Sequence, residues 1–153
     1  MTVEKYLKPF LAASTLAVMF AMPAQAVDVG SVKVADSATV AGKNLILNGA
    51  GMRQLLFIKA YAAGLYLPEK KGSTADVLAE TGPRRVTLHI LREITPDELG
   101  ELFIKSMNKN STKEEKAKII NQTTKFGEMF SSVPEPLKKG DSISLDWFPE
   151  RAP

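Results

Sequence analysis

The run from Leu45 to Leu67 constrains the fold more than any other part of the chain. It is long, poor in charge and rich in apolar residues. A single strand of this length would be far longer than the strands usual in globular proteins. We therefore predict two strands, Leu45–Leu56 and Phe57–Leu67, with Gly49 and Gly51 marking a bend or bulge in the first.

Shorter elements are expected on both sides of this pair. Val29–Val34 alternates loosely and predicts a short strand, whereas the Ser, Thr and Gly content of Asp36–Lys43 predicts a turn region. Ser73 is placed to cap a short helix over Thr74–Glu80. Arg84–Arg92 predicts another strand, with an apolar face formed by Val86, Leu88 and Ile90.

Two helices and a last strand are expected in the C-terminal half. Thr95 is a predicted N-cap, Pro96 occupies the first helical position and Glu98 completes a capping box. A second helix is expected to begin at Ser111 or Thr112. The last strand alternates through Ile143, Leu145 and Trp147. This order predicts an α+β domain with a mainly antiparallel sheet.

The first 26 residues have the features of a secretory signal peptide. Lys5 and Lys8 precede an apolar stretch from Phe10 to Met22, and Ala24-Gln25-Ala26 fits the small-x-small cleavage pattern. We predict cleavage after Ala26, which leaves one domain over residues 27–153. We expect the periplasm of a Gram-negative cell as the destination, and an uncleaved membrane anchor is the alternative.

Composition excludes several kinds of site. The 153 residues contain no Cys and one His, so disulfides, Cys-based zinc sites and multi-histidine metal sites are ruled out. His89 is predicted to be a partly buried strand residue. The formal net charge of +3 is too small to indicate nucleic acid, and the basic residues of the two helices are interspersed with acidic ones. We expect no metal, no cofactor and no nucleic-acid partner.

Arg53 is the most informative charged residue, because it lies in a largely apolar segment. A guanidinium buried there would need an anion. That anion could be a carboxylate of the protein, which spacing alone favours, or the carboxylate of a ligand. The Tyr61 hydroxyl could share it.

Two motifs in order resemble the chalcone isomerase superfamily. Leu47–Arg53 contains Gly-Ala-Gly-x-Arg, and Tyr61–Leu67 ends in Gly-x-Tyr-Leu. The likeness continues through Arg85–Leu88 and the helix after Thr95, and the signal peptide is similar to that of the exported bacterial branch. The resemblance implies a large antiparallel sheet with helices packed on one face and a ligand cleft between them. Family members continue past the strand at Asp146 with further strands and a helix, and we expect these to be absent here, either naturally or because the sequence is incomplete.

The family includes enzymes that close a chalcone to a flavanone and non-enzymatic relatives that bind fatty acids. Arg53 matches the Arg that stabilises developing negative charge in the enzymes and holds the carboxylate in the binders. Tyr61 matches a position that is Thr in plant enzymes and Tyr in the binders. The enzymes carry Tyr, Lys and Asn on the helix where this chain has Leu99, Leu102 and Ser106. The resemblance therefore implies an apolar wall without the polar catalytic groups.

These features together predict a periplasmic, non-catalytic protein that binds a fatty acid or a similar small apolar carboxylate. The predicted ligand-binding residues are Arg53, Tyr61, Leu99 and Leu102. Two alternatives remain open: an intramolecular lyase of the chalcone–flavanone isomerase type, and an interaction module with a filled core. The oligomeric state is not predicted.

Overall fold

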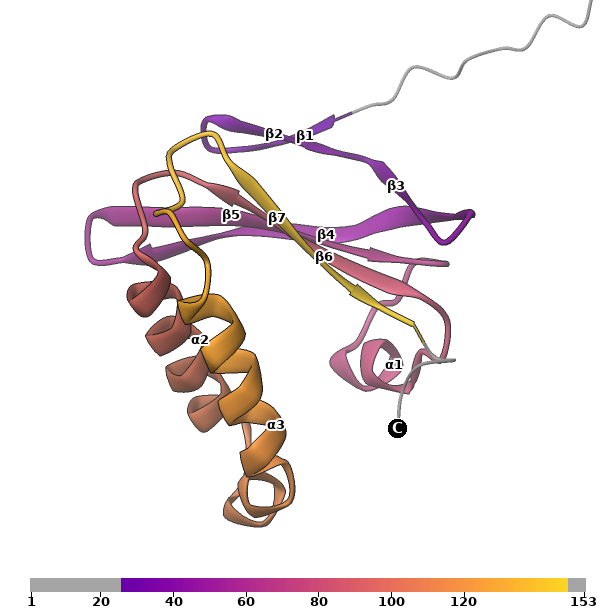
Figure 1. Ribbon diagram of the computed structural model, residues 1–153. Coiled ribbons are helices and arrows are strands. Elements are labelled where there is room, and N and C mark those ends of the chain that lie inside the picture. The colour runs from indigo at the N-terminus through magenta and orange to yellow at the C-terminus, as the bar shows by residue number, and fades with distance from the viewer. Residues whose placement is uncertain (1–25, 149–153) are drawn as a thin grey trace, which may run out of the picture.

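A five-stranded antiparallel sheet forms the centre of the molecule, in the order β3-β4-β5-β6-β7 (Figure 1). The computed structural model describes residues 26–148. A β1–β2 hairpin lies over one face of the sheet and helices α2 and α3 lie against the other. The strands are β1 Ala26–Val29, β2 Val32–Ala35, β3 Ser37–Val40, β4 Lys43–Leu55, β5 Ile58–Leu67, β6 Arg84–Ile90 and β7 Ser142–Trp147; the helices are α1 Thr74–Ala79, α2 Pro96–Asn110 and α3 Lys113–Ser131. The predicted α+β class is confirmed.

The long apolar run folds into two strands, as predicted. β4 and β5 pair in antiparallel register from Ile46↔Leu67 to Leu55↔Ile58, with Phe57 in the turn between them. The register shifts between Leu47 and Gly49, at the predicted bend, and again between Arg53 and Gln54. Irregularities of this kind increase the local twist of a hairpin.

The N-terminal part contains more strand than the sequence pattern predicted. The single strand expected over Val29–Val34 is wrong, because Gly30, at φ +65°, turns the chain between β1 and β2. The turn expected over Asp36–Lys43 is also wrong, because β3 fills most of that segment. Only Ala41 and Gly42 form the turn, with φ of +49° and +75°. Two-residue turns of this kind allow hairpins in segments too short for a clear alternating pattern.

The β1–β2 hairpin is attached to the sheet by a buried apolar cluster. Its buried members are Val34, Val40, Leu45, Leu47 and Tyr66. The Tyr66 hydroxyl donates to the Ala35 carbonyl at 2.9 Å, which satisfies the polar end of a ring that is 3% exposed. Burial raises the pKa of Tyr66 above its ordinary value.

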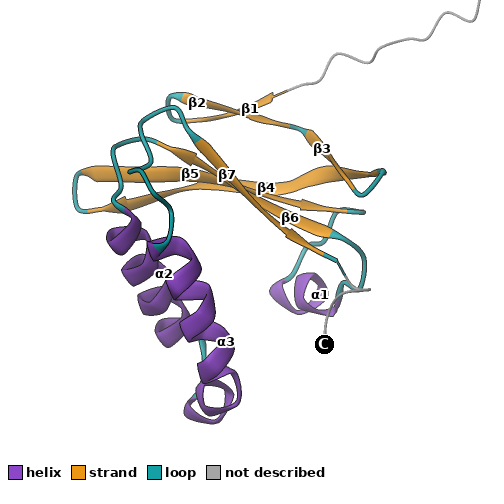
Figure 2. Ribbon diagram, viewed as in Figure 1, coloured by secondary structure: helices purple, strands orange, loops and turns teal. Residues whose placement is uncertain are grey.

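Helices α2 and α3 begin at the predicted caps. The Thr95 hydroxyl accepts from the Glu98 backbone N–H, and the Glu98 carboxylate binds the guanidinium of Arg92. Thr112 and Glu115 form a complete capping box at the start of α3. The two helices pack side by side on one face of the sheet, as Figure 2 shows. None of the helices in residues 26–148 is long and apolar enough to cross a membrane.

A second apolar cluster lies between these helices and the sheet. Ile90 and Ile94 from the β6 side meet Leu99 of α2 and Phe130 of α3. Three rings, those of Phe103, Phe126 and Phe130, pack against one another with centroid separations of 4.7–5.7 Å. This cluster fixes the helix pair over one end of the sheet.

Gly64 lies where the β1–β2 hairpin packs closely on the sheet. A Cβ at this position would lie 2.8 Å from Val34 Cγ1 and 3.2 Å from Leu47 Cδ1, inside the first cluster. Gly64→Ala should therefore lower the free energy of unfolding by about 1–3 kcal/mol, measured by urea denaturation. Gly51→Ala is the matched control, because a Cβ there meets nothing within 4 Å. Equal effects of the two substitutions would contradict this account of the packing.

Candidate functional site

An apolar cleft of about 930 Å³ lies between the helix pair and the sheet, with α1 at one end. Its volume falls in the range of small-molecule sites. Most of the residues that line it are apolar, and the few polar ones come from α3, β6 and β7. The lining consists of Leu65, Val77, Leu78, Arg84, Arg85, Val86, Phe103, Met107, Ile119, Gln122, Thr123, Phe126, Leu145, Asp146 and Trp147.

Strand register builds the floor of the cleft. Leu65, Val86 and Leu145 are consecutive register partners on β5, β6 and β7, so they form one apolar row across three strands. Phe103 and Met107 approach from α2, one helical turn apart. Ile119 and the Phe126 ring contribute from α3. The cleft is therefore the part of the interlayer space that the second apolar cluster does not fill.

Arg84 and Trp147 lie at one edge of the cleft, where Arg84 supplies a positive charge. They are register partners two residues along from Val86 and Leu145, which places them on the same face. The guanidinium carbon of Arg84 lies 5.1 Å from the centroid of the Trp147 ring, a cation–π distance. The Arg84 Nη1 makes a long 3.5 Å contact with the Val77 carbonyl, and its buried Nε has no hydrogen-bond partner within the described part of the chain.

No carboxylate in residues 26–148 forms an ion pair with Arg84. Its guanidinium therefore retains donors that could bind an anion. The neighbouring Arg85 differs, because its Nε and Nη2 donate to both carboxylate oxygens of Asp146 at 2.6 and 2.7 Å. Arg85 thus has its charge balanced within the protein, and Arg84 is the cation of the cleft with capacity for a ligand.

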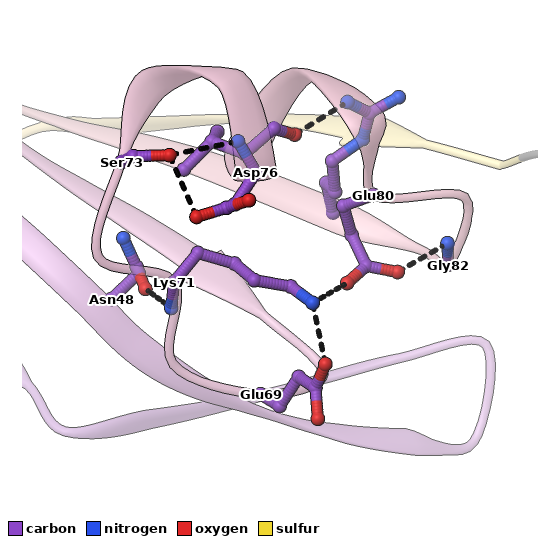
Figure 3. Close-up of polar contacts among 9 residues, drawn as sticks. Asn48, Glu69, Lys71, Ser73, Asp76, Glu80 and Gly82 are labelled. Carbon is purple, nitrogen blue, oxygen red and sulfur yellow. Dashed lines mark hydrogen bonds and ion pairs between the residues drawn. The ribbon is translucent and has the colours of Figure 1, made fainter.

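A polar network fixes α1 beside the cleft (Figure 3). The Lys71 ammonium bridges Glu69 and Glu80, and the Lys71 backbone N–H donates to Asn48 Oδ1 at 2.6 Å. The backbone N–H of Gly82 donates to Glu80 at 2.8 Å and, together with Lys71, lowers the pKa of that carboxyl. The hydrogen bond to Glu69 raises the pKa of Lys71. The network ties the loop before α1 to β4, which positions Val77 and Leu78 at the cleft.

Arg53 and Tyr61 are brought together but lie outside the cleft lining. They are register partners on β4 and β5. Arg53 is exposed, so the burial considered from its sequence context is not found. Within residues 26–148 its side chain forms no ion pair or hydrogen bond, so the structural salt bridge that spacing favoured is not formed there. Tyr61 is partly buried and packs against the second apolar cluster.

The predicted apolar wall on α2 exists, but other residues form it. Leu99 is 5% exposed and belongs to the second cluster, where it contacts the sheet side of the core. Leu102 and Ser106 are half-buried and do not line the cleft. Phe103 and Met107, each one position after these two, face it instead. The resemblance indicated an apolar wall on this helix, but it did not identify which residues of the helix border the cleft.

The described residues offer no preformed metal site. No group of three or more His, Cys, Asp or Glu side chains converges within residues 26–148. His89 is partly buried on β6, as predicted, and its buried Nε2 has no hydrogen-bond partner among the residues that the structure describes. The apolar lining of the cleft, with Arg84 at its edge, could hold an apolar molecule with one anionic end.

The ion pair between Arg85 and Asp146 predicts an acid-dependent stability. Arg85 lowers the pKa of Asp146, so the folded state keeps this carboxylate charged at pH values where the unfolded chain protonates it. The stabilisation from this pair is complete above about pH 5 and is lost as the pH falls from the ordinary Asp value of about 4 through the lowered pKa of the folded state. Asp146→Asn should lower the free energy of unfolding at pH 7 by about 1–2 kcal/mol and flatten its decline on acidification, measured by urea denaturation across that range.

Glu101→Gln is the control for this measurement. It breaks a pair with Lys105 in which both side chains are about 70% exposed, 68% for Glu101 and 72% for Lys105. Pairs of this kind contribute a few tenths of a kcal/mol. If the free energy of unfolding of Asp146→Asn declined on acidification as steeply as that of the unmodified chain, the pair would not link pH to folding.

Comparison with known proteins agrees with the architecture. A family model described as chalcone isomerase-like matches residues 26–152, which includes every element of the described fold. No curated protein matches the chain. The antiparallel sheet, the helices on one of its faces and the cleft between them are the arrangement implied by the sequence motifs. The chain belongs to the chalcone isomerase-like family.

Proposed function

We propose that this chalcone isomerase-like protein binds a small apolar carboxylate, of which a fatty acid is the simplest example. The observation that carries the proposal is the apolar cleft with the Arg84 guanidinium at its edge, which forms no ion pair with a carboxylate of residues 26–148. The acyl chain would lie along the row formed by Leu65, Val86 and Leu145. The carboxylate would accept hydrogen bonds from Arg84, whose guanidinium the Trp147 ring supports on one side.

Typical interaction free energies are large enough to give such a ligand measurable affinity. Each buried methylene contributes up to about 0.8 kcal/mol before ordering costs are subtracted. A hydrogen-bonded carboxylate in a partly dry site adds about 1.5–3 kcal/mol. A medium-length fatty acid therefore reaches micromolar affinity, which corresponds to about −8 kcal/mol.

The pair of Arg53 and Tyr61 is the second candidate for the carboxylate. It rests on the family resemblance and on the register that brings the two residues together. Arg84 is the stronger candidate because it lines the cleft and has a buried donor without a partner. The two sites lie at different positions on the sheet, so substitutions distinguish them.

The enzymatic alternative lacks support in the residues of α2. Leu99, Leu102 and Ser106 supply no acid or base there, and general acid–base catalysis needs placed titratable groups. Efficient and stereoselective cyclisation of a chalcone in an absorbance assay would overturn the non-catalytic assignment. The alternative of a ligand-free module requires a filled core, whereas the interlayer space here contains a cleft.

Export to the periplasm remains a prediction from the sequence. The predicted signal peptide covers residues 1–26 and, apart from Ala26, lies outside the described residues. Binding of a lipid-derived carboxylate is compatible with that location and does not depend on it.

Arg84→Gln should weaken binding of dodecanoate by about tenfold or more, because the charge-assisted hydrogen bonds are lost. Binding of dodecanol should barely change, since the alcohol brings no negative charge. Arg84→Lys should restore only part of the affinity, because the planar fork is missing. Isothermal calorimetry with both ligands measures these differences.

Arg53→Gln is the matched control, because it removes the same kind of charge from an exposed position of the same sheet. We expect this variant to bind both ligands like the unmodified chain. An acid-specific loss in Arg53→Gln, with Arg84→Gln unaffected, would move the carboxylate to the pair of Arg53 and Tyr61. Equal loss of acid and alcohol in Arg84→Gln would show that Arg84 supports the fold and not the ligand.

A further inference from the structure

The turn of the β4–β5 hairpin carries Leu56 and Phe57, which are more exposed than any other described large apolar side chain. Leu56 is 81% exposed, Phe57 94% and Ile58 57%; we call these three residues the hairpin tip. Register explains their exposure, because β3 pairs with β4 only as far as Ile46 and β6 pairs with β5 only from Tyr61 onward. The end of the hairpin therefore projects beyond its neighbours, as Figure 1 shows.

Nothing in the fold accounts for the residue types at the hairpin tip. Leu56 adopts φ +53°, a left-handed conformation that favours Gly, Asn or Asp in a two-residue turn. The Leu56 and Phe57 side chains are almost fully exposed, so they contribute little to the core. Both the backbone strain and the exposed apolar surface reduce stability or solubility, which indicates a role outside folding.

The residues around the hairpin tip are basic. Arg53 and Lys59 are exposed on its two strands. The segment 43–68, which includes the whole hairpin, contains no Asp or Glu. An apolar tip between basic residues matches the water–lipid interface, where apolar side chains enter the acyl boundary and cations contact lipid phosphates.

A second copy of the chain fits this surface less well. Two hairpin tips facing each other would bring like charges of Arg53 and Lys59 together. Three apolar residues are also a small patch compared with the area that stable protein interfaces bury. A bilayer, by contrast, accepts a small protruding tip and supplies the opposite charge.

We propose that the hairpin tip inserts into the interface of a lipid bilayer that contains anionic lipids. Leu56, Phe57 and Ile58 enter the boundary between headgroups and acyl chains, while Arg53 and Lys59 bind phosphate groups. This inference does not depend on the proposed ligand of the cleft. The hairpin tip lies at one end of the β4–β5 pair, and Leu65, which borders the cleft, lies toward the other end.

A fluorescence measurement tests insertion at the hairpin tip directly. Phe57→Trp in a Trp147→Phe background places the only tryptophan of the chain in the tip. With vesicles of acyl-brominated phosphatidylglycerol, its emission should shift to the blue and be quenched by the bromine atoms. Ile120→Trp in the same background is the control. Ile120 is 57% exposed, the same fraction as Ile58, but it lies on α3. Equal quenching at both positions, or none at position 57, would overturn the proposal.

Sedimentation with vesicles separates the apolar and charged contributions. Leu56→Asn combined with Phe57→Ser should lower partitioning onto phosphatidylglycerol vesicles by at least about tenfold. Arg53→Gln and Lys59→Gln should each lower it by about fivefold on these vesicles, with little change on phosphatidylcholine. Ile120→Gln should bind vesicles like the unmodified chain. All variants are prepared with the same N-terminal residues, so that differences in vesicle binding arise from the substitutions. A concentration-dependent dimer that the tip substitutions dissociate, without vesicle binding, would instead assign the tip to self-association.

Discussion

The pairing of β4 with β5 is the interaction on which the rest of the structure depends. It is the longest pairing in the sheet, and it offers two faces that must both be covered. The β1–β2 hairpin covers one face, where Gly64 permits close approach and Tyr66 reaches the Ala35 carbonyl. The helix pair covers part of the other. The cleft and the hairpin tip are the two places where this covering is incomplete.

The incomplete cover on the helix side follows from where the aromatic residues lie. Phe103, Phe126 and Phe130 pack α2 and α3 against one end of the sheet, and α1 is tied separately to β4 through Lys71. Between these two attachments, the sheet presents an apolar floor that no side chain of residues 26–148 covers completely. Arg84 stands at the edge of that floor, and its buried Nε has no hydrogen-bond partner among residues 26–148, which is why the proposed ligand has an anionic end.

Local signals in the sequence predicted the parts of the fold that local interactions determine. The caps at Ser73, Thr95 and Thr112 and the division of the long apolar run depend on neighbouring residues, and all were found. The short strands β1–β3 were missed because a two-residue turn interrupts each alternation. Arg84 was missed as a site residue because its partner Trp147 is distant in the sequence and adjacent only through the β6–β7 register. Leu99 was assigned to the cleft by matching it to the family's helix positions, whereas in this fold it packs into the second apolar cluster.

The central claim is that an apolar carboxylate lies in the cleft with its charged end at Arg84. Trp147 is the only tryptophan of the chain and lies against that guanidinium, so its emission reports the orientation of the ligand. Saturating 2-bromododecanoate, with bromine beside the carboxylate, should quench Trp147 strongly, whereas 12-bromododecanoate should quench it weakly. The reverse order, or no quenching by either acid, would contradict the claim.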